Sequence, residues 1–468
     1  IVYWDGGNGA EALSADRADH AALHRGIASV RRLFAASETF RPAAHVRMLY
    51  AYRESDLPQP HHDAVFGFAR SLLTVNHRFE FSTLRHRAGD VEACADAIVA
   101  EFSVVSGFGG NEIASRDGRR YRRAPHAIDT APGEDGIGNL PLRERGTYLI
   151  TGGGGKLGLL VARWMAEQCH ANLLLSGRAS APSASLRQSI DALRALGARV
   201  EYCSGDITDA DDVAALIASA QRAFGALHGV VHCAGVSSDR SVLDLNDDEF
   251  AGLLAPKVDG TILLDRATAA LPLDFFVAFS SVSALIGDLG SCAYAAGNRF
   301  MDSFVSWRET LRARGLRKGR SLSIDWPLWA SGGMEITGSD ASVLGFSGMQ
   351  ALTAAEGIAA FEKILRTDHD CVLVSVGDSE RIARTLRLLP PAVENTAASA
   401  RPVAPTAPRP TAAPAPRAER TAQTPTTASA DLQTRTERYI KERMATVVKT
   451  RADAIDSHAS FEQCGMDS

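Results

Sequence analysis

The feature that most constrains the fold is a run of four glycines in the segment Thr-Gly-Gly-Gly-Gly-Lys-Leu-Gly at residues 151–158. An apolar stretch at 148–150 precedes it, and a helical pattern at 159–169 follows it. Glycines at such a strand-to-helix turn let the backbone approach a pyrophosphate, whose charge is stabilised by the amides and the dipole at the helix N-terminus. The position of this turn indicates dinucleotide binding, and a bare flexible loop is the alternative.

An alternation of apolar stretches and helical patterns continues after this glycine loop. Parallel sheets covered by helices on both faces produce this alternation. We therefore predict an α/β fold with a Rossmann-like, doubly wound parallel sheet. The later strands are expected at 173–175, 200–202, 230–232, 275–279 and 371–376, with helices such as 211–224 between them.

Composition excludes several classes of protein. No apolar run approaches the ~20 residues that a membrane span needs, and a net charge of −5 gives no reason to expect a nucleic acid or an anionic membrane as partner. The seven cysteines are scattered and odd in number, without a Cys-x-x-Cys pair, which suits reduced thiols in a cytoplasmic protein. The chain opens without Met and stops abruptly at Ser468, so we expect both ends to be cuts through a larger polypeptide.

The order of features along the chain predicts five segments. The first mixes short strands with helices and contains the hairpin signal Asp117-Gly118. Nine of the 19 prolines lie between 390 and 425 among Ala, Thr and Arg, which predicts an extended linker. A helical stripe follows it. The segments are a mixed unit at 1–125, a connector at 126–145, the sheet-forming unit at 146–389, the linker at 390–429 and a final unit at 430–468.

Residues after the second and third strands indicate which dinucleotide is bound. An acidic side chain after the second strand favours NAD, whereas an arginine accommodates the extra phosphate of NADP. Arg178 stands there, so it is the candidate partner of the 2′-phosphate of NADPH, and a solvated surface arginine is the alternative. Asp206 could accept a hydrogen bond from the adenine amino group or cap the next helix. The candidate cofactor-binding residues are Thr151, Gly152, Gly153, Gly155, Leu157, Gly158, Ser176, Arg178, Asp206, Ile207, Ala234 and Gly235.

Four residues form a candidate reaction centre. Ser281 follows the predicted strand at 275–279, near the carboxyl edge of the sheet, where ligands bind. Tyr294 and Asn298 are four positions apart and share one face of a helix. A carbonyl under reduction needs a hydrogen-bond donor and an acid, which Ser281 and Tyr294 can supply. The ammonium group of Lys257 would lower the pKa of the phenol from about 10. Taken singly, each residue could be an ordinary core or capping residue.

The order and spacing of several motifs are similar to those of a known family. They are the glycine loop, His-Cys-Ala-Gly-Val from His232, and the thirteen positions between Ser281 and Tyr294. Asn298 stands where the wider superfamily has its lysine, and Lys257 lies in an upstream Pro-Lys-Val-x-Gly segment. Residues 146–389 thus resemble the ketoreductase domains of modular (type I) polyketide synthases, a branch of the short-chain dehydrogenase/reductase superfamily.

The resemblance covers the rest of the chain. It implies that residues 1–125 are a truncated Rossmann-like structural subdomain without a cofactor site. Residues 461–468 resemble the start of an acyl carrier protein, in which the serine of Asp-Ser receives a 4′-phosphopantetheine arm. Ser468 is the candidate attachment site, with an ordinary exposed serine as the alternative. Four irregularly spaced histidines in the first unit are not expected to bind a metal: His61, His62, His77 and His86.

The resemblance also bears on the configuration of the product. B-type ketoreductases carry Leu-Asp-Asp where this chain has residues 237–239, of which only Asp239 matches. A-type enzymes carry tryptophan at the position of Ile286, and Ala296 replaces the proline of enzymes that select an epimerised α-methyl group. This favours B type and a D-hydroxyl, while a turn residue is the alternative for Asp239. The tryptophans of the loop at 326–329 belong either to a lid over the substrate or to the core.

The resemblance implies an NADPH-dependent reductase of a β-ketoacyl thioester. Its partners would be an acyl carrier protein in the same polypeptide, which carries the substrate, and other polyketide synthase domains. Two alternatives are a catalytically silent scaffold within a synthase and a reductase of fatty-acid intermediates or free metabolites. The filled set of four catalytic positions argues against a scaffold, and the linker with its carrier-like tail argues against a free substrate.

Overall fold

The strands of the protein form two sheets. In spatial order, the first contains β1 (Val2–Asp5), β2 (Val46–Arg53), β3 (Phe79–His86), β4 (Asn111–Arg116) and β5 (Arg119–Arg122). The second contains β12 (Cys371–Leu373), β11 (Arg320–Trp326), β10 (Phe275–Ser281), β9 (Gly229–His232), β6 (Thr147–Thr151), β7 (Asn172–Gly177) and β8 (Arg199–Ser204). The computed structural model describes residues 1–5, 17–40, 45–76, 78–87, 91–104, 109–128, 139–236, 245–288, 291–330, 345 and 347–388.

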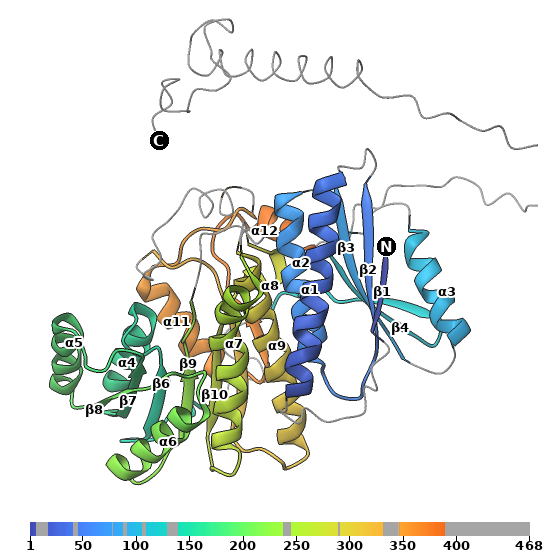
Figure 1. Ribbon diagram of the computed structural model, residues 1–468. Coiled ribbons are helices and arrows are strands. Elements are labelled where there is room, and N and C mark those ends of the chain that lie inside the picture. The colour runs from blue at the N-terminus through green and yellow to red at the C-terminus, as the bar shows by residue number, and fades with distance from the viewer. Residues whose placement is uncertain are drawn as a thin grey trace, which may run out of the picture. The chain divides into compact units, whose positions relative to one another are not determined.

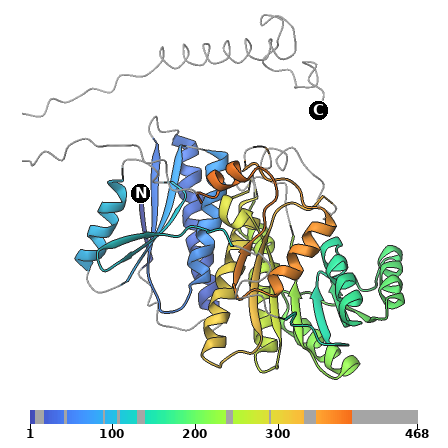
Figure 2. The same ribbon diagram turned by 180° about the vertical axis from the view of Figure 1, so that it is seen from behind.

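Helices divide between the two sheets. The five-stranded unit also contains α1 (Arg17–Phe40), α2 (Pro60–Val75) and α3 (Val91–Phe102). The seven-stranded unit contains α4 (Lys156–Cys169), α5 (Ala184–Ala195), α6 (Ala210–Phe224), α7 (Asp247–Thr268), α8 (Ser283–Ile286), α9 (Cys292–Ala313), α11 (Ala354–Leu365) and α12 (Ser379–Thr385). Figure 1 shows both units, and Figure 2 shows α11 and α12 from behind.

All strands of the larger sheet are parallel, which confirms the predicted doubly wound fold. Its order reverses at β6, which pairs with β7 on one side and β9 on the other. Alternate side chains of a strand point to opposite faces. Ile150 accordingly packs with α4 on one face, while Leu149 packs with α6 on the other. Ligands of such sheets bind beyond the carboxyl ends of the strands at the reversal point, which here is β6.

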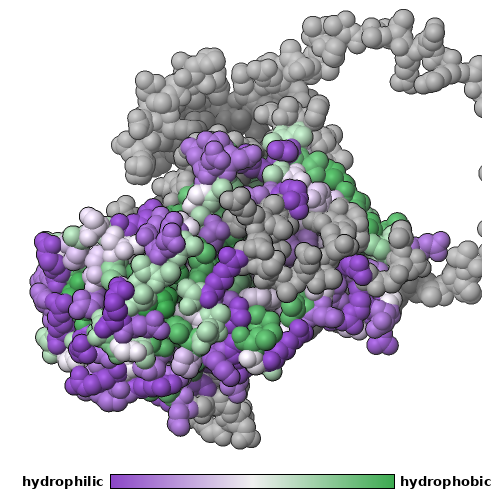
Figure 3. Space-filling model, turned by 60° about the horizontal axis from the view of Figure 1, so that its bottom comes forward, coloured by the Kyte–Doolittle hydropathy of each residue, from purple (hydrophilic) through white to green (hydrophobic). Residues whose placement is uncertain are grey.

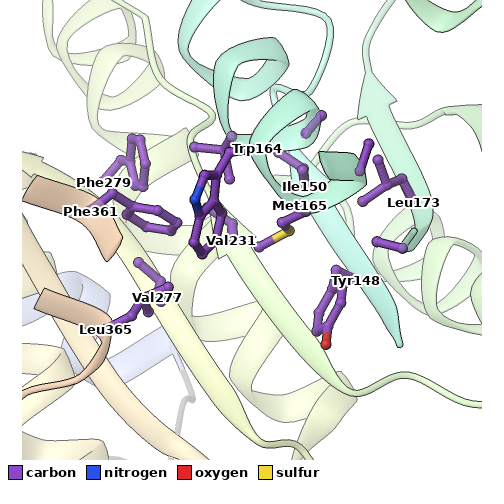
Figure 4. Close-up of a cluster of buried hydrophobic side chains, with 14 of the residues drawn as sticks. Tyr148, Ile150, Trp164, Met165, Leu173, Val231, Val277, Phe279, Phe361 and Leu365 are labelled. Atoms are coloured by element: carbon purple, nitrogen blue, oxygen red, sulfur yellow. The ribbon is translucent and has the colours of Figure 1, made fainter. Parts of the chain in front are cut away.

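Aromatic and aliphatic side chains together form the core on one face of the larger sheet (Figure 4). Trp164 of α4 meets Phe361 of α11 edge to face, with ring centroids 5.3 Å apart, and Phe279 of β10 lies against the same Phe361 ring. Edge-to-face pairs add about 0.5–1.5 kcal/mol to the burial of apolar area. These contacts hold α4, and thus the loop before it, against the sheet.

The smaller sheet is parallel from β1 to β4 and antiparallel between β4 and β5. The predicted hairpin is present, because Asp117 and Gly118 have φ angles of 51° and 68° between β4 and β5. Positive φ at both central residues is the geometry of a tight hairpin turn that Asp-Gly favours. The predicted strand at 371–376 is shorter in the structure, where it ends at Leu373.

Helix α2 joins the two units by packing along α9 (Figure 1). Apolar side chains from both helices form one core cluster, which includes Phe68 and Phe300. A buried polar network crosses the same junction. Asp63 of α2 accepts hydrogen bonds from Tyr52 (2.9 Å) and from Ser303 of α9 (2.7 Å).

Polar and apolar residues intermingle on the face shown in Figure 3. No helix in the described ranges is long and apolar enough to cross a membrane. The six cysteines within those ranges carry free thiols. The predicted linker and the predicted carrier segment, 390–429 and 430–468, lie outside the described residues.

Candidate active site

The glycine loop between β6 and α4 is closely packed. Gly152 has a φ of 65°, in the left-handed region that favours glycine, and a Cβ atom there would lie 3.0 Å from the backbone of Ala234. A Cβ atom on Gly158 would lie 2.8 Å from the Gly152 carbonyl oxygen. Gly152 therefore makes the turn, and Gly158 lets α4 approach the loop.

The N-terminus of α4 fits a pyrophosphate. Gly155 is the N-cap and offers no side chain to cap the helix. The first N–H groups of a helix have no acceptor within the helix, so those of α4 are suited to bind an anionic group. Gly154, Gly155 and Lys156 are exposed, so the turn is accessible. These donors stand beside β6, at the reversal point of the sheet.

Arg178 and Asp206 lie near each other beyond β7 and β8. The Asp206 carboxylate accepts the N–H (2.9 Å) and the O–H (2.8 Å) of Thr208. These hydrogen bonds hold the pKa of Asp206 below its usual value, and the charge of Arg178 lowers it further. Asp209 caps α6, so a capping role for Asp206 is excluded. Arg178 is exposed, as a partner for an incoming phosphate must be.

Lys257 is buried beneath the centre of the site. Its Nζ donates to the Phe279 carbonyl oxygen (3.1 Å) and lies 5.3 Å from the centroid of the Tyr294 ring. Its aliphatic stem packs on Gly297, where a Cβ atom would lie 3.1 Å from the Lys257 Cβ. Burial lowers the pKa of Lys257 to about 8, because the charged form loses its hydration.

Ser281 and Asn298 are connected through Ser283. The Ser281 Oγ accepts the Ser283 N–H (3.2 Å), and Asn298 Nδ2 donates to the Ser283 Oγ (3.2 Å). The Ser281 hydroxyl can therefore still donate its own proton. Asn298 Oδ1 is buried without a hydrogen-bond partner in the described part of the chain. Tyr294 and Asn298 both lie on α9, as their spacing predicts.

Some of the remaining predicted site residues lie within the described part of the chain, and others lie outside it. Gly235 lies beside Lys257, since a Cβ atom there would be 3.1 Å from the Lys257 Cε. Ile207 is buried against Gly260 of α7. The predicted stereocontrol residue Asp239 and the predicted attachment site Ser468 lie outside the described residues.

A comparison with known proteins identifies the larger unit. Residues 146–331 match the family described as the KR domain. Residues 146–331 belong to the KR domain family.

Two relatives of the KR domain and its flanks are polyketide synthases. PksM of Bacillus subtilis (strain 168) is 35% identical over 332 residues, which are 70% of this chain and 7% of PksM. ThaG of Burkholderia thailandensis is 39% identical over 280 residues, which are 59% of this chain and 5% of ThaG. The chain therefore spans less than a tenth of the length of these synthases.

Solved ketoreductase structures share the two-sheet architecture. A ketoreductase domain from the bacillaene assembly line aligns with a TM-score of 0.69 and 26% identity, over 82% of this chain and 94% of that chain. An N-terminal ketoreductase from the macrolactin assembly line aligns with a TM-score of 0.69 and 29% identity, over 82% and 74%. Both alignments extend beyond the KR domain, so this chain has the fold of polyketide synthase ketoreductases.

His232 of the KR domain contacts the site, but its side chain was not predicted to. Its ring nitrogens meet Thr151 Oγ1 (2.7 Å) and the Pro256 carbonyl oxygen (3.0 Å). Because a carbonyl only accepts, Nε2 carries the proton and Thr151 donates to Nδ1. Burial and the charge of Lys257 lower the pKa of His232 to about 3, so the ring is neutral. The sequence feature that could have identified His232 is its position at the end of a buried strand.

The two tryptophans of the loop after β11 are core residues. Trp326 and Trp329 are both buried, with ring centroids 5.0 Å apart. Trp329 packs on Gly357 of α11, where a Cβ atom would overlap its ring. The core alternative therefore holds for these side chains. Residues 331–344, which follow this loop, lie outside the described residues.

The buried Asp302 and Asp325 form a cluster with the half-buried Cys371, which was not predicted. Their ligand atoms lie within 4.8 Å of one another, a spacing that could hold a metal ion. Asp302 also accepts a hydrogen bond from Ser323 (2.8 Å). Burial and the neighbouring Asp302 raise the pKa of Asp325, which favours a protonated Asp325.

Of the four histidines considered as metal ligands, His61 and His62 lie together on α2. His62 Nδ1 lies 2.9 Å from the Tyr50 hydroxyl, and its ring stacks on Tyr52 at 4.3 Å. His62 is therefore a hydrogen-bonded core residue. His86 lies on β3, while His77 is outside the described residues.

Proposed function

We propose that this chain is an NADPH-dependent ketoreductase that reduces a β-ketoacyl thioester on an acyl carrier protein to the β-hydroxyacyl thioester. One observation carries the proposal. Lys257, Ser281, Tyr294 and Asn298 come from three different elements to one place, next to the glycine loop at the carboxyl edge of the sheet. The KR domain match and the ketoreductase structures support the same reaction class.

Ser281 binds the carbonyl oxygen of the substrate. Its Oγ accepts a backbone N–H and keeps its proton for an external acceptor. A carbonyl under reduction develops negative charge on oxygen, and a preorganised donor stabilises that charge more than the neutral ground state.

Tyr294 donates its phenol proton to the same oxygen. The Lys257 ammonium group, 5.3 Å from the ring centroid, favours the phenolate that remains. The donation of Lys257 to the Phe279 carbonyl holds its ammonium in place. Asn298 donates to the Ser283 Oγ, which holds the Asn298 side chain in the site.

The cofactor site follows from the same edge of the sheet. When bound, NADPH supplies the hydride that reduces the carbonyl carbon. The free N–H groups of α4 bind its pyrophosphate, and Arg178 binds its 2′-phosphate.

The substrate arrives on a carrier protein, and the product has the D configuration of B-type enzymes. The proposal of a tethered substrate rests on the polyketide synthase relatives and on the carrier-like segment that ends at Ser468, whose serine would bear 4′-phosphopantetheine. The configuration rests on Asp239 and on Ile286. Overall similarity does not decide it, because A-type ketoreductases also align, at 27% identity.

Tyr294→Phe tests the reaction. The full chain is incubated with NADPH and β-ketoacyl thioesters, with and without an α-methyl group, and the alcohol is analysed on a chiral column. The variant should lose about 10²–10⁴-fold in kcat, the usual contribution of a positioned acid, while NADPH affinity and fold stay intact. Near-normal turnover would refute the catalytic assignment. An inactive wild type that binds no NADPH would identify a scaffold.

A further inference from the structure

A cavity of about 610 Å³ lies along the outer edge of β12, between the two units. Its walls come from α2, β4, β5 and the segment at 123–128 on one side, and from α8, α11, β12 and α12 on the other. None of the four candidate catalytic residues and no residue of the glycine loop lines it. Its volume is that of pockets that hold small organic ligands, for which about 300–1,000 Å³ is typical.

Three arginines, Arg70, Arg122 and Arg387, line this cavity, and we call them the arginine cluster. The guanidinium group of Arg387 donates to Asn111 Oδ1 (2.6 Å) and to the Gly109 carbonyl oxygen (3.1 Å), which are neutral acceptors. That of Arg70 lies against Gly110, close enough to overlap a Cβ atom built there.

Arg70 and Arg387 are half-buried and Arg122 is exposed, and none of the three has a carboxylate partner among the described residues, whereas the fully buried arginines do. Arg299 and Arg308 are fully buried, and they pair with Glu112 (2.6 Å) and Asp265 (2.9 Å). Burial and the like charge of Arg387 lower the pKa of Arg70 to about 10. Like charges held together away from water destabilise a fold until an anion offsets them.

The acidic groups that face the cavity are already engaged. Glu112 pairs with Arg299, and Asp370 accepts from the Ser306 hydroxyl (2.6 Å). The other two acidic groups, Asp302 and Asp325, belong to the cluster with Cys371 described above. The other basic side chains in the walls are Lys363, the histidines His126 and His369, and Arg123, which lies 3.8 Å from Glu112; Cys371 lines the walls as well.

We propose that this cavity binds a small amphipathic anion, with its phosphate or carboxylate group at the arginine cluster. Guanidinium groups bind both oxyanions through paired, charge-assisted hydrogen bonds. The apolar part of the ligand contacts Leu285, Ile286 and Leu386, which line the same cavity.

Thermal unfolding of the full chain with saturating NADPH tests this. NADPH occupies the dinucleotide site, so the added probes, inorganic phosphate and monobutyl phosphate, report on the cavity. Both should raise the unfolding temperature in a saturable way, and monobutyl phosphate should reach half-saturation at about a tenfold lower concentration, because its chain buries apolar surface.

Variants separate this cavity from general salt effects. Arg70→Gln and Arg387→Gln should abolish the saturable shift, and Arg70→Gln should also raise the unfolding temperature of the anion-free protein by removing an unpaired buried charge. The control Arg32→Gln changes an exposed arginine of α1 and should keep the shift. An unsaturable shift, or one of equal size in all variants, would overturn the proposal. Equal half-saturation for the two phosphates would overturn the apolar contact.

Discussion

A Cβ atom added to Gly67 of α2 would lie 2.6 Å from the carbonyl oxygen of Ala295 on α9. The same atom would lie 2.7 Å from the Cβ of Arg299. The two helices thus cross in backbone contact, one residue after Tyr294. The five-stranded unit, which has none of the predicted catalytic residues, therefore contacts α9 directly beside the tyrosine of the proposed reaction.

Gly67→Ala should push α9 away from α2, because the closest atom belongs to the backbone and cannot rotate aside. We expect a loss of stability of about 1–3 kcal/mol and a lower kcat with little change in NADPH affinity. Urea denaturation and steady-state kinetics measure both. Gly252→Ala is the matched control, since that helical glycine of α7 has nothing within 4 Å, and it should be neutral or stabilising. Equal effects in both variants would contradict a role for the crossing.

Lys257→Met should stabilise the protein while abolishing reduction. Below pH 8, Lys257 is protonated in both the folded and the unfolded chain. Only the folded chain then has the free-energy cost of burying this charge. Between about pH 8 and the usual 10.5, the folded chain loses the proton first, so wild-type stability rises with pH. The advantage of the variant should therefore be about 1–3 kcal/mol below pH 8 and shrink toward pH 10.5.

Urea denaturation at several pH values measures this difference. The control Lys318→Met changes an exposed lysine and should show no such trend. A constant difference between wild type and Lys257→Met across pH 7–10 would disagree with a buried ammonium group.

Arg178→Ala should weaken NADPH binding about 10–100-fold, the usual worth of a charge-assisted hydrogen bond, and leave NADH binding unchanged. The reason is that only NADPH carries the 2′-phosphate. Fluorescence titration with both cofactors measures the ratio. Arg163→Ala, an exposed arginine that pairs with Glu167 on α4, serves as control. An equal loss for both cofactors would argue that Arg178 does not select the phosphate.

His232→Phe should destabilise the protein by about 1–3 kcal/mol, because Thr151 Oγ1 and the Pro256 carbonyl each lose a buried partner. In the unfolded chain His232 takes up a proton below its usual pKa of 6.5, whereas in the folded chain it stays neutral down to about pH 3. Wild-type stability should thus fall between pH 6.5 and pH 3, and the variant should lack this component. Denaturation at pH 5 and pH 7 measures it, and identical pH dependence would rule out a neutral buried ring.

Local signals predicted much of the fold. The hairpin at Asp117-Gly118 follows from two adjacent residues that tolerate positive φ. The parallel strands follow from apolar stretches separated by helical patterns, because each strand is buried on both faces. The predicted strand at 371–376 was three residues too long, because the apolar pattern continues past Leu373, where the pairing of β12 with β11 ends.

Contacts between distant segments could not be predicted in the same way. Ser281, Tyr294 and Asn298 were identifiable from spacing, since strand ends and helix faces are local properties. The connecting roles of Ser283 and His232 depend on which side chains meet in space. The hydrogen bond of Asp63 to Ser303 spans 240 positions, and no pattern in either segment identifies its partner.

The crossing of α2 and α9 limits how this protein can be divided. The KR domain match begins at residue 146, and a fragment cut there would lose α2. Phe300 and Phe304 would then face water, and Arg299 would lose Glu112, its partner at 2.6 Å. For anyone who transplants reductases between assembly lines, the smallest transferable piece therefore carries both sheets, and a swap at the family boundary would deliver an aggregation-prone half.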